Sequence, residues 1–130
     1  MSKSEAQSQK QVHIVEDDPA VLDSMKVMLE AEGYTVTVYE NAEKFHDWVV
    51  GDTARTAKGC LLLDLHMEGM GGIELIEKLR AYKIDIPIIV VTGAGTPTQK
   101  ARAKELGAHA VYDKPVDKDV LIQTLDATLI

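Results

Sequence analysis

The chain has 130 residues, 45% of them hydrophobic and 27% charged, a composition typical of one globular domain. Its formal net charge of −7 argues against a surface that binds nucleic acid directly or adsorbs to an anionic membrane. The single cysteine, Cys60, excludes an internal disulfide, and no apolar run reaches the roughly 18 residues of a membrane helix. The N-terminus lacks the apolar stretch of a signal peptide. We therefore predict a cytoplasmic domain at residues 11–130 after a flexible polar tail at 1–10.

Five short apolar runs have the length of strands, and each is followed by a segment with helical spacing. The runs lie at 12–15, 34–39, 60–63, 88–91 and 110–112. Three of the helical segments begin at a typical capping residue, namely Asp18, Asn41 and Asp117. The runs 60–63 and 88–91 are apolar throughout, as parallel strands buried on both faces are. This alternation predicts an α/β fold with a single doubly wound, five-stranded parallel sheet.

Polar residues stand just beyond the ends of four of the predicted strands. In strand order they are Glu16 and Asp17, then Asp64, then Thr92 and Gly93, and finally Lys114. In an open parallel sheet, ligands bind beyond the carboxyl ends of the strands. We therefore expect three carboxylates, a hydroxyl and an ammonium group to meet at one edge of the sheet.

This set of groups suits phosphoryl transfer to a carboxylate. Three clustered carboxylates repel one another unless a cation lies among them, and an open site of oxygen ligands suits Mg²⁺. Asp64 can then act as the nucleophile and form an acyl phosphate. Lys114, Thr92 and the amide of Gly93 can donate to the transferring oxygens.

Four segments resemble the motifs of response-regulator receiver domains. They are VHIVEDD at 12–18, LLDLHM at 62–67, VVTG at 90–93 and DKP at 113–115. The motifs occur in the family's order and spacing, and the resemblance covers essentially the whole chain after the tail. It implies the flavodoxin-like receiver fold with strand order 2-1-3-4-5, and a cis peptide bond between Lys114 and Pro115.

The resemblance also implies a role for each residue of the site. The implied Mg²⁺ ligands are Glu16, Asp17, Asp64 and the backbone carbonyl of His66. Asp64 is the implied phosphoacceptor. Three groups are implied to contact its phosphoryl group: the hydroxyl of Thr92, which acts as the switch, the cationic side chain of Lys114, and the backbone amide of Gly93.

A receiver of this kind is a phosphoacceptor switch, which catalyses only its own phosphorylation and dephosphorylation. The resemblance implies that a histidine kinase or a histidine phosphotransfer protein supplies the phosphoryl group. It implies that phosphorylation switches binding of a downstream protein. It also makes a phosphorylation-dependent homodimer through the last two helices plausible.

The sequence departs from the family pattern at three positions. Glu68 stands where proline is usual, four residues after the acceptor, and Val111 stands where an aromatic residue often takes part in the switch. Glu16 stands where aspartate is commoner, so its longer side chain can reach a metal through water. The resemblance also places His66 opposite Ala94 beside the phosphoryl group, and we hypothesise that His66 modulates autodephosphorylation.

Three other functions share parts of this pattern. A haloacid-dehalogenase-like phosphatase also uses an aspartate nucleophile, but needs a second aspartate two residues later, where this chain has His66. A nucleotide-binding module would use the glycines of GAG at 93–95, but its fingerprint belongs after the first strand. A pseudo-receiver would bind partners without phosphorylation. We interpret His13 and Cys60 as structural residues.

Overall fold

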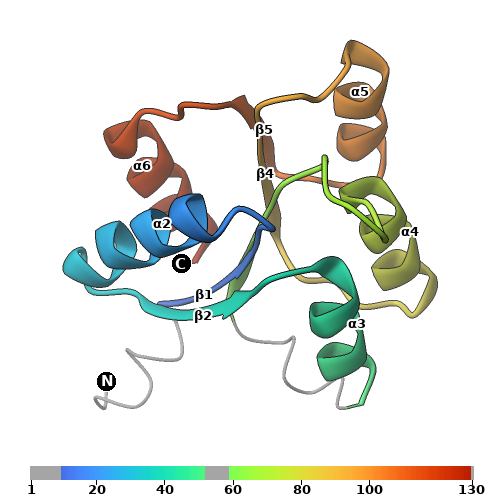
Figure 1. The fold of residues 1–130 in the computed structure, drawn as a ribbon, viewed down its shortest axis with the longest axis horizontal. Helices are drawn as coiled ribbons and strands as arrows, with labels where there is room; N and C mark the ends of the chain where they lie inside the picture. Colours follow the sequence, from blue (N-terminus) through green and yellow to red (C-terminus); the bar gives the residue numbers. More distant parts are fainter. Residues whose placement is uncertain (1–9, 52–58, 130) are drawn as a thin grey trace.

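The computed structural model describes residues 10–51 and 59–129. Five strands and five helices alternate along this part of the chain (Figure 1). In chain order they are β1 (Gln11–Val15), α2 (Pro19–Ala31), β2 (Thr35–Tyr39), α3 (Ala42–Val50), β3 (Cys60–Leu63), α4 (Gly72–Ala81), β4 (Ile88–Thr92), α5 (Pro97–Glu105), β5 (Ala110–Asp113) and α6 (Lys118–Thr128). The predicted strand bounds are correct to within one residue. Residues 1–9 of the predicted tail lie outside the described residues.

The five strands form one parallel sheet in the order β2-β1-β3-β4-β5, which confirms the predicted fold class and strand order. The register determines which residues meet at the carboxyl edge. Val15 pairs with Leu63, and the amide of Asp64 donates to the carbonyl of Val15 at 3.2 Å. The residues that follow β1 and β3 are therefore neighbours, although they are 48 positions apart, from Glu16 to Asp64.

Helices cover both faces of the sheet. In Figure 1, α2 and α6 lie on one side of the strands, and α3, α4 and α5 lie on the other. The strand β3 serves both cores, because Leu61 and Leu63 contribute to one core while Cys60 and Leu62 contribute to the other. Burial on both faces explains the continuous apolar run, and it confirms the structural role predicted for Cys60.

The helices begin where capping chemistry allows. The side chains of Asp18, Asn41 and Asp117 accept backbone amides at the starts of α2, α3 and α6, as predicted. The helix α5 carries a reciprocal capping box between Thr96 and Gln99, which we did not predict. Each such cap typically contributes about 1 kcal/mol, which is important for a helix as weakly amphipathic as α5.

Three further expectations can be compared with the structure. The Lys114–Pro115 peptide bond is cis, as the resemblance implied. His13 is buried in β1, with Nδ1 3.2 Å from the Tyr39 hydroxyl and its ring 5.2 Å from that of Trp48, which confirms its structural role. No helix within the described ranges has both the length and the apolar run needed to cross a bilayer.

Candidate functional site

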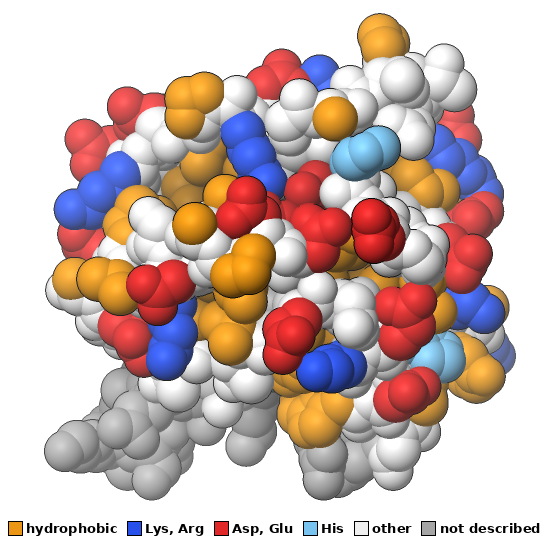
Figure 2. Space-filling view, in the orientation of Figure 1, with side chains coloured by type: hydrophobic (Ala, Val, Ile, Leu, Met, Phe, Trp, Pro, Cys, Tyr) orange, Lys and Arg blue, Asp and Glu red, His pale blue; other side chains and the backbone are white. Residues whose placement is uncertain are grey.

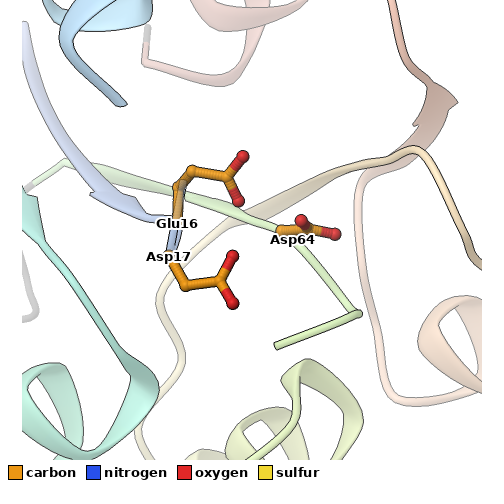
Figure 3. A group of neighbouring side chains, drawn as sticks. All are labelled: Glu16, Asp17 and Asp64. Atoms are coloured by element: carbon orange, nitrogen blue, oxygen red, sulfur yellow. The ribbon is translucent and has the colours of Figure 1, made fainter. Parts of the chain in front are cut away.

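Three carboxylates gather at the carboxyl edge of the sheet (Figure 3). Glu16 and Asp17 directly follow β1, and Asp64 directly follows β3; one ligand oxygen from each lies within 4.8 Å of the others. Glu16 is 2% exposed and Asp64 8% exposed, whereas Asp17 is open to solvent. The cluster is therefore enclosed on the sheet side and accessible from outside. Figure 2 shows acidic side chains gathered at the centre of this face, with basic and histidine side chains beside them.

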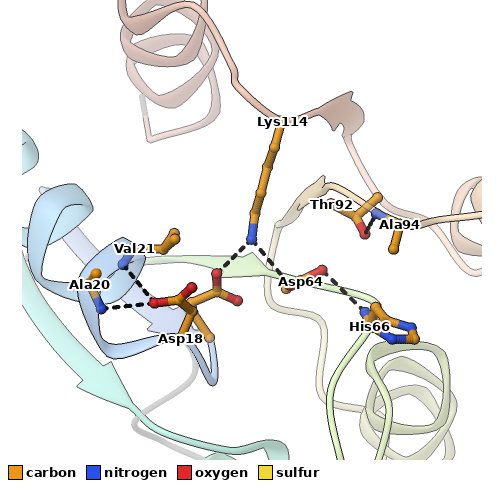
Figure 4. Close-up of polar contacts among 9 residues, drawn as sticks. Asp18, Ala20, Val21, Asp64, His66, Thr92, Ala94 and Lys114 are labelled. Carbon is orange, nitrogen blue, oxygen red and sulfur yellow. Dashed lines mark hydrogen bonds and ion pairs between the residues drawn. The ribbon is translucent and has the colours of Figure 1, made fainter.

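Lys114 reaches into this cluster from the end of β5 (Figure 4). Its ammonium nitrogen lies 2.5 Å from Oε1 of Glu16 and 3.1 Å from Oδ2 of Asp64. Burial alone disfavours a charged lysine, but these two carboxylates raise the pKa of Lys114 above its usual value. One cation thus bridges the two buried carboxylates, and the site still holds more negative than positive charge.

The pKa values of the two bridged carboxylates move in opposite directions, although burial acts upward on both. Burial raises the pKa of Glu16 to about 7, although the ammonium of Lys114 acts in the opposite direction. Burial also acts upward on Asp64, but hydrogen bonds with Glu16, the His66 amide and Thr92, together with Lys114, hold the pKa of Asp64 below its usual value. Asp64 is therefore the group that stays anionic at neutral pH, as a nucleophile requires.

The donor set fits a hard divalent cation. Oε2 of Glu16 is buried without a hydrogen-bond partner among the described residues, a costly state for a carboxylate oxygen. The surrounding ligands are all oxygens, and the exposed side of Asp17 leaves room for the waters that Mg²⁺ keeps. A cation here would satisfy the orphaned oxygen and balance the excess negative charge.

The remaining predicted residues border this cluster. Thr92 ends β4 fully buried, and its hydroxyl accepts the amide of Ala94 at 3.4 Å. Gly93 is exposed, and a Cβ added there would lie 3.6 Å from the side chain of Lys114. The amide of His66 donates to Oδ1 of Asp64 at 3.1 Å, while its exposed ring is directed away from that carboxylate (Figure 4).

The structure thus brings every predicted site residue to one edge of the sheet. Sequence reasoning assigned Lys114 to the phosphoryl group and missed its close contact with Glu16. It also missed Glu43, whose carboxylate accepts the amide of Met70 in the loop after Asp64 at 2.8 Å. A glutamate in the first turn of a helix is common, so no signal in the sequence indicated this long-range contact.

Comparison with known proteins gives a consistent result. Residues 12–126 match the family model described as the response regulator receiver domain. The transcriptional regulatory protein FixJ of Azorhizobium caulinodans is 35% identical over 118 residues, which cover 91% of this chain and 54% of that protein. The response regulator protein TodT of Pseudomonas putida is 30% identical over 118 residues, which cover 91% of this chain and 50% of that protein. The chain spans about half the length of the curated relatives it matches.

Solved structures show the same similarity. The crystal structure of FixJ-N superposes with a TM-score of 0.82 at 34% identity and covers 92% of both chains. A CheY-like response regulator receiver domain protein from Methanospirillum hungatei JF-1 superposes with a TM-score of 0.75 at 31% identity, covering 92% of this chain and 93% of that one.

Proposed function

Because the chain belongs to the response regulator receiver domain family of two-component systems, a family of signalling switches, we propose that it accepts a phosphoryl group on Asp64 in a Mg²⁺-dependent reaction. The observation that carries this proposal is the convergence of Asp17, Asp64 and the Glu16–Lys114 pair at one edge of the sheet. The proposed donor is a phosphohistidine of a histidine kinase or of a histidine phosphotransfer protein.

The proposed metal ligands are Glu16, Asp17, Asp64 and the backbone carbonyl of His66. Bound there, Mg²⁺ supplies positive charge against the transferring phosphoryl oxygens. The carboxylates hold and orient this charge, and Glu16 must release the proton that its raised pKa favours before it can bind a metal directly.

Asp64 is the proposed nucleophile. One of its oxygens bonds to phosphorus while the bond from phosphorus to the donor's imidazole nitrogen breaks, and the electron pair stays on that nitrogen. Lys114 lies 3.1 Å from Asp64 before transfer, so its ammonium needs only a short movement to contact the phosphoryl oxygens. The backbone amide of Gly93, an exposed residue, is the second proposed donor to the phosphoryl group.

Thr92 is the proposed switch. Its hydroxyl now accepts the amide of Ala94, and a phosphoryl group on Asp64 would offer it a stronger, charged partner. Movement of Thr92 toward that group would shift the β4–α5 segment and the surface formed by α5 and α6. That surface would then bind a downstream protein or a second copy of the chain. In this proposal the domain spans residues 11–130, acts in the cytoplasm and catalyses only its own phosphorylation and dephosphorylation.

The decisive test is intact-protein mass after incubation with acetyl phosphate, with and without Mg²⁺. We expect the wild type to gain one phosphoryl group only with Mg²⁺, Asp64→Ala to gain none, and the control Asp119→Ala to match the wild type, because Asp119 is exposed in the first turn of α6. A folded wild type that gains no phosphoryl group from acetyl phosphate or a kinase would instead favour the pseudo-receiver alternative, which the departures at Glu68 and Val111 kept open.

A further inference from the structure

The loop that joins β3 to α4 is rich in glycine and lies against the backbone of the proposed phosphoacceptor. Gly69 adopts a φ of +75°, in the region that favours glycine. A Cβ added at Gly72 would lie 2.6 Å from the carbonyl oxygen of Asp64 and 2.7 Å from Cα of Leu65. The start of α4 therefore packs directly on the Asp64–Leu65 backbone, and any change in the loop conformation reaches the site.

A glutamate from a different helix holds this loop. Glu43 lies in the first turn of α3, and its Oε1 accepts the amide of Met70 at 2.8 Å. The same oxygen would lie 2.6 Å from a Cβ added at Gly69, so the carboxylate also contacts the backbone one residue earlier. Within residues 10–51 and 59–129, this is the only side-chain hydrogen bond that another element makes to residues 65–71.

The charge of Glu43 makes this contact strong. The hydrogen bond from the Met70 amide lowers the pKa of Glu43, so the side chain is a carboxylate at neutral pH. Hydrogen bonds to a charged acceptor are shorter and stronger than those between neutral groups. The contact is also partly shielded from solvent, and α3 packs beside α4.

We propose that Glu43 is a positioning residue, which holds the β3–α4 loop in the conformation that presents the backbone of His66 to the metal and phosphoryl site. This inference rests on the proposed function, because the carbonyl of His66 is a proposed metal ligand. Among the described residues, three hydrogen bonds fix the backbone of the loop: the His66 amide on Asp64, the Gly72 amide on the Leu65 carbonyl at 3.1 Å, and the Met70 amide on Glu43. Of these hydrogen bonds, only the last involves a side chain from outside the segment 64–72. Met67 and Met70 also pack against the neighbouring core, but these apolar contacts do not hold a backbone amide. Without Glu43 the glycines would therefore let the loop backbone sample other conformations.

The test compares Glu43→Ala, Glu43→Gln and the control Glu74→Ala. Glu74 is an exposed glutamate in the first turn of α4, so its substitution removes the same charge near the loop without removing the contact with Met70. The readouts are amide hydrogen exchange of residues 66–71 by NMR, Mg²⁺ affinity by calorimetry and thermal unfolding.

We expect Glu43→Ala to speed exchange of these amides about tenfold, as loss of one charge-assisted hydrogen bond implies. We expect it to weaken Mg²⁺ binding about fivefold, because the binding then has to order the loop. Glu43→Gln should restore both to within about twofold of the wild type, since its amide oxygen can still accept the Met70 amide. Glu74→Ala should match the wild type in both measurements. If Glu43→Ala does not fold, Glu43→Asp withdraws the carboxylate from the Met70 amide by one methylene and should have effects in the same direction.

Unchanged exchange in a folded Glu43→Ala would overturn the proposal. Faster exchange with unchanged Mg²⁺ affinity would also overturn it, because Glu43 would then stabilise the loop without positioning the site. If the wild type itself binds no Mg²⁺, the proposed function fails, and the exchange comparison alone then decides whether Glu43 holds the loop.

Discussion

The middle of the sheet and two carboxylates at its carboxyl edge are both buried, but with opposite chemistry. In β3, residues Cys60–Leu63 are at most 1% exposed and entirely apolar. The next residue, Asp64, is 8% exposed and carries a charge, and Glu16 at the end of β1 is 2% exposed. Burial stabilises the apolar side chains, whereas it penalises both carboxylates.

Along β3, the apolar residues therefore serve the stability of the fold, and the residue that follows the strand serves the site. The apolar residues of β3 join the two cores and hold the strands in register. At the edge, contacts that include Lys114 keep Asp64 ionised against the effect of burial, whereas burial keeps the pKa of Glu16 raised. Substitutions one or two positions apart should therefore have different consequences.

The largest effect is expected in the middle of the sheet. Leu62→Ala should lower the free energy of unfolding by about 2–5 kcal/mol, because it removes buried methyl groups and leaves a cavity. Urea unfolding measures this, with Val27→Ala as the control, since Val27 is 60% exposed and should change stability by less than about 0.5 kcal/mol. Phosphorylation per folded molecule should stay at the wild-type level. A loss of phosphorylation in the folded fraction would contradict the separation of the two regions.

At the edge, Lys114→Ala should slow phosphorylation by acetyl phosphate about 10²–10³-fold, because it removes a preorganised donor to the transferring oxygens. The initial rate of mass gain measures this. Lys118→Ala is a suitable control, because Lys118 pairs with Glu32 on the surface, away from the three clustered carboxylates. If the two variants have equal rates, Lys114 does not take part in the transfer.

The buried carboxylate Glu16 should make stability depend on pH in the metal-free protein. The pKa of Glu16 is about 7 in the folded state and 4.5 in the unfolded state, so the folded state holds the proton more tightly. The protonated side chain therefore contributes its full stabilisation below about pH 4.5, and this stabilisation is lost as the pH rises through 7. The stability of Glu16→Gln relative to the wild type should therefore increase by about 1–3 kcal/mol between pH 4.5 and pH 8. Urea unfolding in EDTA measures this, with the exposed Glu30→Gln as the control. A difference that does not change with pH would refute the raised pKa.

The smallest effect is expected at the rim of the site. His66→Ala should speed the decay of the phosphorylated protein about two- to fivefold, since exposed polar contacts contribute up to about 1 kcal/mol. Loss of phosphoryl mass over time measures this, with His109→Ala as the control, because His109 is exposed and precedes β5. Equal decay rates in wild type and His66→Ala would rule out the modulating role.

Much of the fold could be predicted because its signals are local. Continuous apolar runs marked β3 and β4, and the capping residues Asp18, Asn41 and Asp117 marked three helix starts. The signal for α5 is weaker, because its amphipathic pattern is faint. Its capping box between Thr96 and Gln99 contributes stability that the apolar pattern does not show.

The membership of the candidate site could also be predicted, because carboxyl ends of parallel strands share one edge. The unequal exposure of Glu16 and Asp17 could not be predicted. Neighbouring residues at a strand end point in different directions, and only the packing around them determines which one is covered.

The sequence by itself determined the order of strands and helices, three of the caps and the residue types at each strand end, because these depend on periodicity and chemistry within a few positions. Only the tertiary structure decided the distances that the chemistry needs. The register of Val15 against Leu63 places Glu16 beside Asp64, and the end of β5 brings Lys114 between them. Such distances depend on how separate segments pack together, which no local pattern encodes.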